Sequence, residues 1–238
     1  MGHPRGYGLG VKRGGPQLIP RPEGWQPGGV SPWSRLDPDS RRVGLDQIEK
    51  ALAARGPGTT RSDPWRRVES EHRSAVLVPL YDDEGEVHVV MTRRSPHLRK
   101  HRWEVSFPGG RRDDTDESLW HTALRETYEE IGLDQSVPRL IGELDRFVTV
   151  SSVSLVSPLV AVLPGRPTEL VASPDEVEAI LYVPLSELLL DEVFREEIWP
   201  IDEIYRPITF FELDGDTVWG ATAAMLRQLL AIATETDG

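Results

Sequence analysis

Three glutamates in one short segment carry the clearest chemical signal in this sequence. Glu126, Glu129 and Glu130 stand at positions i, i+3 and i+4 within FPGGRRDDTDESLWHTALRETYEEIGL (107–133). On an α-helix, which turns by about 100° per residue, their carboxylates share an arc of about 100°. Like charges at this spacing repel one another, and a hard divalent cation such as Mg²⁺ would relieve the repulsion. Taken alone, the segment fits either a metal site or a solvated acidic helix face.

A glycine pair stands just upstream of the glutamates, in Pro108-Gly109-Gly110. Glycine lets the backbone approach a metal ion or a phosphate closely, and its carbonyl oxygen can serve as a further metal ligand. The pair therefore favours the metal site.

The spacing of seven residues across this segment resembles the Nudix box. The seven are Gly110, Glu117, Arg125, Glu126, Glu129, Glu130 and Gly132. Thr127 stands where an aliphatic residue is usual, and six residues, rather than the usual five, separate Gly110 from Glu117. The coenzyme A pyrophosphatase branch of the family shows the same extra residue.

A second motif, VMTRRSPHLRKHRWEVSFPGG (90–110), resembles the signature of that branch. The resemblance implies that Arg94, Arg99, Trp103 and Phe107 bind substrate, the two arginines through bidentate phosphate contacts. Plain surface charge is the alternative for the arginines. Trp103 stands where the signature has glycine, which leaves two readings open: ordinary packing, or an altered choice of substrate.

The resemblance implies a metal-dependent pyrophosphohydrolase that cleaves coenzyme A or acyl-CoA to 3′,5′-ADP and (acyl-)4′-phosphopantetheine. It implies that Mg²⁺ or Mn²⁺ is held by Glu126, Glu129, Glu130 and the carbonyl of Gly110. Gly110, Glu117, Arg125 and Gly132 would have structural roles, with Arg125 paired to Glu117.

A general base in this family often comes from outside the box. The segment SPDEVEAILYVPL (173–185) offers Glu176 first and Glu178 second, and Glu126 is a further candidate. A turn-capping or solvated role is the alternative for the first two.

Rival functions follow from the same residues. Another diphosphate, such as ADP-ribose, NADH or a nucleoside triphosphate, is the main alternative substrate. A non-catalytic nucleotide-binding module is the minor alternative, and it predicts damaged metal ligands. Net charge is −12 overall and −19 over residues 113–238, which argues against a nucleic-acid partner.

The elements that must position these residues alternate irregularly along the chain, which predicts a mixed sheet. With the resemblance, this gives an α+β fold, a Nudix-type α/β/α sandwich with a mixed β-sheet between helices. We expect a helix over 117–131 that ends at Gly132, a β pair over 192–199 and 206–214, and a last helix over 221–233. The other expected strands cover 74–81, 87–92, 104–107, 138–145, 154–163 and 178–185, and a short helix covers 184–190.

Residues 1–60 form an extension ahead of the Nudix hydrolase domain expected at 61–238. Residues 1–36 contain nine Gly and six Pro, so we expect a mobile or loosely draped stretch, with Trp25 and Trp33 as anchors on the domain or at a subunit interface. Apolar spacing predicts a helix at 43–55. The resemblance also allows a homodimer.

The chain contains no cysteine and no apolar run long enough to span a membrane. Its first residues lack the apolar centre of a secretory signal. We therefore expect a cytoplasmic protein without a membrane partner.

Overall fold

The computed structural model describes residues 13–60, 73–148, 154–201 and 204–236. The helices are α1 (Leu45–Arg55), α2 (Leu119–Ile131), α3 (Leu185–Leu188) and α4 (Gly220–Ala233). The strands are β1 (Gln26–Pro27), β2 (Arg73–Asp83), β3 (Glu86–Arg94), β4 (Val105–Ser106), β5 (Gly109–Arg111), β6 (Arg139–Glu143), β7 (Phe147–Val148), β8 (Leu155–Val162), β9 (Val177–Pro184), β10 (Phe194–Ile201), β11 (Ile204–Glu212) and β12 (Thr217–Trp219).

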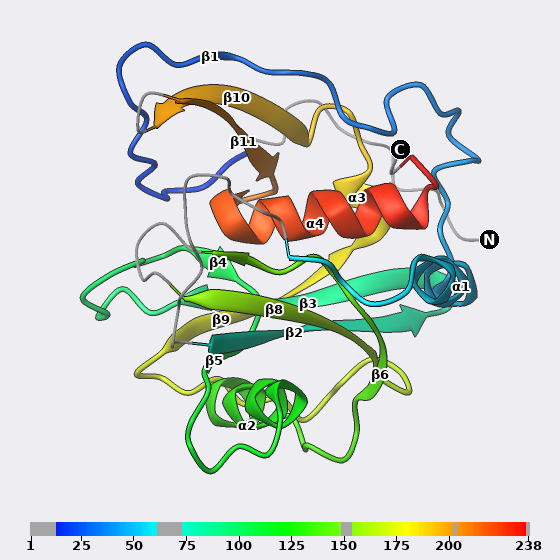
Figure 1. Ribbon diagram of the computed structural model, residues 1–238, viewed down its shortest axis with the longest axis vertical. Coiled ribbons are helices and arrows are strands. Elements are labelled where there is room, and N and C mark those ends of the chain that lie inside the picture. Colours follow the sequence, from blue (N-terminus) through cyan, green and yellow to red (C-terminus); the bar gives the residue numbers. More distant parts are fainter. Residues whose placement is uncertain (1–12, 61–72, 149–153, 202–203, 237–238) are drawn as a thin grey trace, which may run out of the picture.

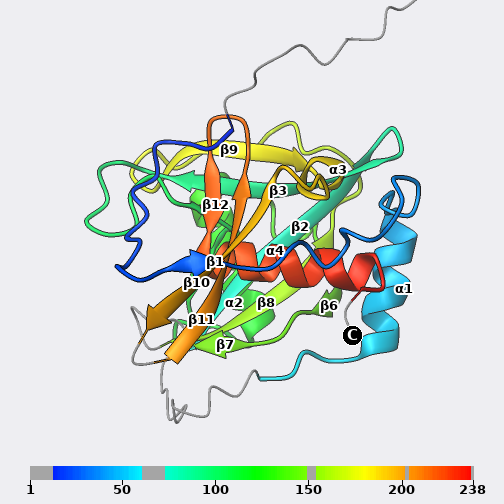
Figure 2. The ribbon, with the colours of Figure 1, turned by 90° about the horizontal axis from the view of Figure 1, so that it is seen from above.

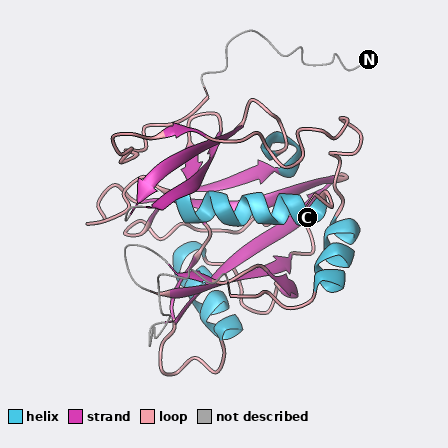
Figure 3. Cartoon of the chain, turned by 45° about the horizontal axis from the view of Figure 1, so that its top comes forward, coloured by secondary structure: helices cyan, strands magenta, loops and turns pink. Residues whose placement is uncertain are grey.

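The elements stack in layers (Figure 1). Strands β2 to β9 form a mixed sheet, with α2 on one face and α4 on the other. Beyond α4 lies an antiparallel sheet in the order β1-β10-β11-β12, so that α4 runs between two sheets (Figure 3). The predicted α+β sandwich is confirmed, and the second sheet is an addition to it.

The centre of the mixed sheet is the parallel pair β2 and β8. Both strands are nearly continuous apolar runs, which suits strands that are covered on both faces. Helix α4 is buried around almost its whole circumference, as expected for an apolar helix between two sheets.

Strands β2 and β3 diverge, and this divergence creates the site. They pair with each other only near their connecting turn, where Leu80 faces Val89. Farther along, β3 pairs with β4 and β2 pairs with β5. The turn at Phe107-Pro108 and the glycines that begin β5, together called the glycine turn, therefore fill the gap between the two long strands.

Two hydrophobic clusters hold the layers together. The larger lies between the mixed sheet, α4 and the second sheet, and the smaller lies under α2. The part of the chain that the structure describes contains no helix with both the length and the apolar character needed to cross a membrane.

Residues 13–36 lie against the domain, and of the two predicted anchors Trp33 is confirmed, whereas Trp25 is 38 % exposed. Trp33 is fully buried, stacked against Phe211 at 6.3 Å and edge-on to Phe194 at 5.5 Å between ring centroids. The predicted helix is present as α1, and it lies beside one end of α4 (Figure 2). Glycine and proline counts describe local backbone preference and miss such long-range burial. Residues 1–12 lie outside the described ranges.

Shortening one leucine of α1 tests how firmly the extension is attached. Leu52 is 2 % exposed and packs against Gly142 of β6. Leu52→Ala should lower the free energy of unfolding by about 2–5 kcal/mol, the usual cost of a core leucine-to-alanine change. Leu18→Ala is the matched control, since Leu18 belongs to the same extension and is 92 % exposed. Urea unfolding checks both, and equal midpoints for the two variants would mean a detached extension.

Candidate active site

Helix α2 begins and ends at residues whose types explain its bounds. The Ser118 side chain caps the N-terminus by accepting the backbone N–H of His121 at 3.1 Å. Gly132 ends the helix in the left-handed region, with a φ of 70°. These signals confirm the predicted end and move the expected start by two residues.

Helix α2 packs only part of its apolar side chains against the sheet. Trp120 is partly buried against the smaller hydrophobic cluster, whereas Tyr128 is 54 % exposed. The buried side chains are Thr122, Ala123, Thr127, Glu130 and Ile131. The helix is thus turned so that one carboxylate, that of Glu130, points inward beneath the glycine turn and is 4 % exposed.

The glycine turn leaves no room for side chains. Gly109 has a φ of 149°, and a Cβ there would lie 2.4 Å from the carbonyl oxygen of Ala75. A Cβ on Gly110 would lie 2.3 Å from Oε2 of Glu126. The glycine backbone therefore lies directly against a carboxylate of the helix, as the sequence predicts for a close approach.

Burial dominates the electrostatics of Glu130. It raises the pKa of this carboxyl to about 8, and the charges of Glu176 and Glu126 push in the same direction. Arg94 and the backbone N–H of Gly109 act against that rise. Oε2 of Glu130 is buried and has no hydrogen-bond partner among the described residues.

Glu126 shows the same trend more weakly. Burial raises its pKa, and Glu129 and Glu176 add to the rise, while Arg125 opposes it. Glu129 is the most exposed of the three helix glutamates, with 52 % of its side chain accessible. The acidic cluster therefore has an inner member, Glu130, an intermediate member, Glu126, and an outer member, Glu129.

Arg125 pairs with Asp116 and not, as predicted, with Glu117. Its guanidinium donates two 3.0 Å hydrogen bonds to Asp116, and others to Glu126 and Glu129. Asp116 is 2 % exposed, and Arg125 holds its pKa far below the usual range. Glu117 is exposed, and none of the described contacts of Arg125 reaches it.

A signal for Asp116 exists in the sequence. Asp116 follows Gly110 with the usual five intervening residues, whereas Glu117 has the usual distance to Arg125. Both acids precede the helix, where no fixed period applies, so spacing alone cannot choose between them. The buried hydrogen bonds to Arg125, Thr122 and the backbone of Asp113 decide the matter.

The loop before β9 brings Glu176 to the cluster. Backbone N–H groups of Val171 and Ser173 donate to the carbonyls of Ile131 and Glu130 at the end of α2. From there the Glu176 charge acts on both Glu126 and Glu130. The charge of Glu178 acts on Arg93, so Glu176 is the candidate whose charge is shown to reach the cluster.

The four predicted substrate residues have different surroundings. The charge of Arg94 reaches Glu130, and Arg99 lies exposed on the loop that follows β3. Trp103 is half-buried and has a φ of 63°, a conformation typical of glycine. Phe107 is 2 % exposed within the larger hydrophobic cluster, so it supports the turn from inside and is no longer assigned to substrate.

The donors fit a divalent cation in their chemistry. The inner oxygen of Glu130 lacks a partner, and the mutual repulsion of Glu126, Glu130 and Glu176 calls for positive charge. In the described ranges, no three Asp, Glu, His or Cys side chains already enclose a point where a cation would bind. The fit therefore rests on donor type and on the unpaired oxygen.

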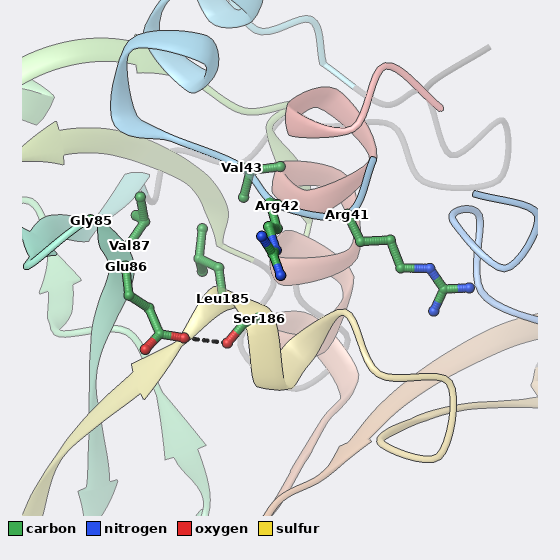
Figure 4. Close-up of a pocket in the computed structure, with 8 residues that line it drawn as sticks. All are labelled: Arg41, Arg42, Val43, Gly85, Glu86, Val87, Leu185 and Ser186. Atoms are coloured by element: carbon green, nitrogen blue, oxygen red, sulfur yellow. Dashed lines mark hydrogen bonds between the residues drawn. The ribbon is translucent and has the colours of Figure 1, made fainter. Parts of the chain in front are cut away.

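A separate pocket lies at the far end of β3 (Figure 4). Glu86, which lines this pocket, lies eight residues before Arg94 on β3. That separation corresponds to roughly 26 Å along a strand. Its volume is about 300 Å³, and Glu86 accepts a hydrogen bond from Ser186 there. The lining residues are Arg41, Arg42, Val43, Gly85, Glu86, Val87, Leu185 and Ser186. This pocket shares no residue with the acidic cluster.

Comparison with known proteins gives the following matches. The family model for the NUDIX domain matches residues 71–203. A peroxisomal coenzyme A diphosphatase of Caenorhabditis elegans, ndx-8, is 39% identical over 167 residues, covering 69% of this chain and 70% of the relative. The mitochondrial Nudix hydrolase 15 of Arabidopsis thaliana is 35% identical, covering 68% of this chain and 59% of the relative. A crystal structure of the Nudix hydrolase RenU from M. Smegmatis is 17% identical with a TM-score of 0.45, covering 77% of this chain and 98% of that one.

Proposed function

This chain belongs to the NUDIX domain family and is a Nudix hydrolase, and from that premise we propose that it cleaves the diphosphate of coenzyme A or acyl-CoA. The products would be 3′,5′-ADP and 4′-phosphopantetheine or its acyl form. One observation carries the choice of substrate. Trp103 has a φ of 63°, a backbone conformation that glycine adopts readily, at the position where the coenzyme A signature has glycine. The relative named as a coenzyme A diphosphatase supports the same choice.

We propose that Glu126 and Glu130 hold Mg²⁺ or Mn²⁺, with Glu129 and the Gly110 carbonyl contributing. The cation would neutralise the diphosphate and acidify a bound water. Arg94 faces the same cluster and would bind a phosphate oxygen. Glu176 would accept one proton from the attacking water as a new P–O bond forms. The bond from that phosphorus to the bridging oxygen breaks, and the bridging oxygen leaves with the other phosphate.

A product assay tests the proposal. Coenzyme A, dephospho-coenzyme A, ADP-ribose, NADH and nucleoside triphosphates are compared at equal concentration with Mg²⁺ or Mn²⁺. We expect 3′,5′-ADP from coenzyme A and a clear preference over the dephospho form. Preferred turnover of ADP-ribose or NADH would agree with a Nudix hydrolase but would reject coenzyme A as its substrate. Binding without turnover of any of them would favour the nucleotide-binding module, against which the intact Glu126 and Glu130 argue.

The pairing of Arg125 gives a matched prediction on two adjacent residues. Asp116→Asn should lower kcat/KM about 10–100-fold, the usual loss when a group that orients metal ligands is removed. Glu117→Gln should stay within about twofold, because Glu117 is exposed and Arg125 contacts Asp116. Steady-state kinetics of both variants check this, and a larger loss in Glu117→Gln than in Asp116→Asn would restore the pairing with Glu117 that the resemblance implies.

A further inference from the structure

A glutamine of the N-terminal extension lies under the loop that joins β3 to β4. Gln17 is 7 % exposed and makes three hydrogen bonds with its amide group. Nε2 donates to the carbonyl of Trp103 at 3.0 Å and to Asp216 at 2.8 Å. Oε1 accepts the backbone N–H of Thr217 at 2.9 Å. The side chain thus joins the β3–β4 loop to the turn before β12.

The loop that Gln17 contacts, residues 95–104, is held in an unusual shape. His101 and Trp103 both have left-handed backbones, with φ of 57° and 63°. Side chains with a Cβ disfavour this region, and such residues persist only where surrounding contacts enforce them. The ends of the loop are paired, since the N–H of Trp103 donates to the carbonyl of Arg94 and the N–H of Arg94 to that of Glu104.

The anchor behind Gln17 is rigid. Asp216 is 3 % exposed and accepts two hydrogen bonds from Arg93, at 2.8 and 2.6 Å. Arg93 precedes Arg94, the arginine whose charge reaches the acidic cluster. The amide of Gln17 therefore ties the left-handed Trp103 to a partly buried ion pair at the end of β3.

We infer that Gln17 is a positioning residue for substrate binding, which holds the 95–104 loop, and with it Arg94 and Arg99, in the shape that receives the nucleotide. The inference rests on the proposed function for its substrate. It gives the extension a role in this site, because contacts from Gln17 fix a loop that begins nearly eighty residues later in the sequence. A glycine at position 103 would adopt the same backbone without help, and a tryptophan needs the added contact.

The experiment replaces Gln17 with Met, which has a similar length but no amide. Coenzyme A hydrolysis should show KM raised about 10-fold with kcat within about threefold, since the loop binds and does not react. In the Trp103→Gly background the same replacement should raise KM less than about threefold. Gln47→Ala is the matched control, because Gln47 also lies in the extension and donates to a backbone carbonyl, that of Ala233 at 2.8 Å. It should leave KM unchanged.

Hydrogen exchange supplies a readout that needs no substrate. Gln17→Met should speed amide exchange in peptides covering 95–104 about 10-fold and leave α2 unchanged. If Gln17→Met does not fold, Gln17→Asn, one methylene shorter, is measured for the same changes. Faster exchange without coenzyme A turnover would reject the proposed substrate and retain the positioning of the loop. Unchanged exchange over 95–104, or an equal KM effect in the Trp103→Gly background, would overturn the inference.

Discussion

Glu130→Gln should abolish nearly all turnover, with kcat lowered about 10³-fold or more. A catalytic cation supplies several kcal/mol of charge stabilisation, and each 1.36 kcal/mol lost is a factor of ten in rate. Glu130 is the innermost of the three glutamates, and its Oε2 has no partner among the described residues. Glutamine keeps the shape and removes the charge that would hold the cation. Steady-state kinetics and a Mg²⁺ titration of the same protein check both consequences.

When metal is chelated, the same Glu130→Gln change, which lowers activity, should raise the stability of the folded protein relative to wild type. Burial raises the pKa of Glu130 to about 8 from the ordinary 4.5. Between these values the folded chain binds more protons than the unfolded chain, so its stability falls as pH rises from about 4.5 to about 8. One such group gives a slope of at most about 1.4 kcal/mol per pH unit.

Glu130→Gln should lack this component because it has no carboxyl to ionise. Thermal unfolding in EDTA at pH 5 and at pH 8 checks the prediction: wild type should lose more stability across this interval than the variant. Glu129→Gln is the control, because Glu129 is half exposed. Parallel curves for wild type and Glu130→Gln would show that Glu130 is ionised in the apo protein throughout.

Glu176→Gln should lower kcat about 10²–10⁴-fold, the usual contribution of a positioned general base. Glu176 acts on Glu126 and Glu130, and its backbone carbonyl accepts the N–H of Ser95 at 2.8 Å, which fixes it beside the end of β3. Its KM should change little, since glutamine retains the hydrogen-bonding capacity of the side chain.

Glu178→Gln provides the matched control for Glu176. It is the same substitution two residues away, on a side chain that acts on Arg93. It should leave kcat within about threefold of the wild-type value. Equal losses in both variants, or full activity in Glu176→Gln, would show that another residue is the general base, and Glu126 is the next candidate.

The elements that sequence predicts well are those with local signals. Helix α2 has a serine cap and a terminal glycine, and α4 has a continuous apolar sequence, so both follow from short windows of sequence. Strands β1 and β5 are too short for any period, and they form only through partners distant in sequence. The second sheet was therefore predicted only in its long pair, β10 and β11.

For the site, residue types could be predicted but the geometry only in part. The proposed metal chemistry of Glu126 and Glu130 rests on their spacing together with the resemblance to the Nudix box, whereas the inward turn of Glu130 depends on how α2 packs beneath the glycine turn. Asp116 and Phe107 show the same limit. A buried carboxylate and an exposed one look alike in sequence, and so do a core phenylalanine and one that binds substrate.

The burial of Trp33 has a consequence for how the protein is made. Its ring partners, Phe194 and Phe211, lie more than 160 residues later, and β1 likewise pairs with β10. A ribosome adds about 5–20 residues per second, so the extension emerges roughly 10–30 s before the surfaces that receive it. This stretch is rich in glycine and proline and poor in apolar residues, so it exposes little apolar surface for premature association during that interval. Closure of the larger core therefore waits until β10, β11 and α4 have left the ribosome.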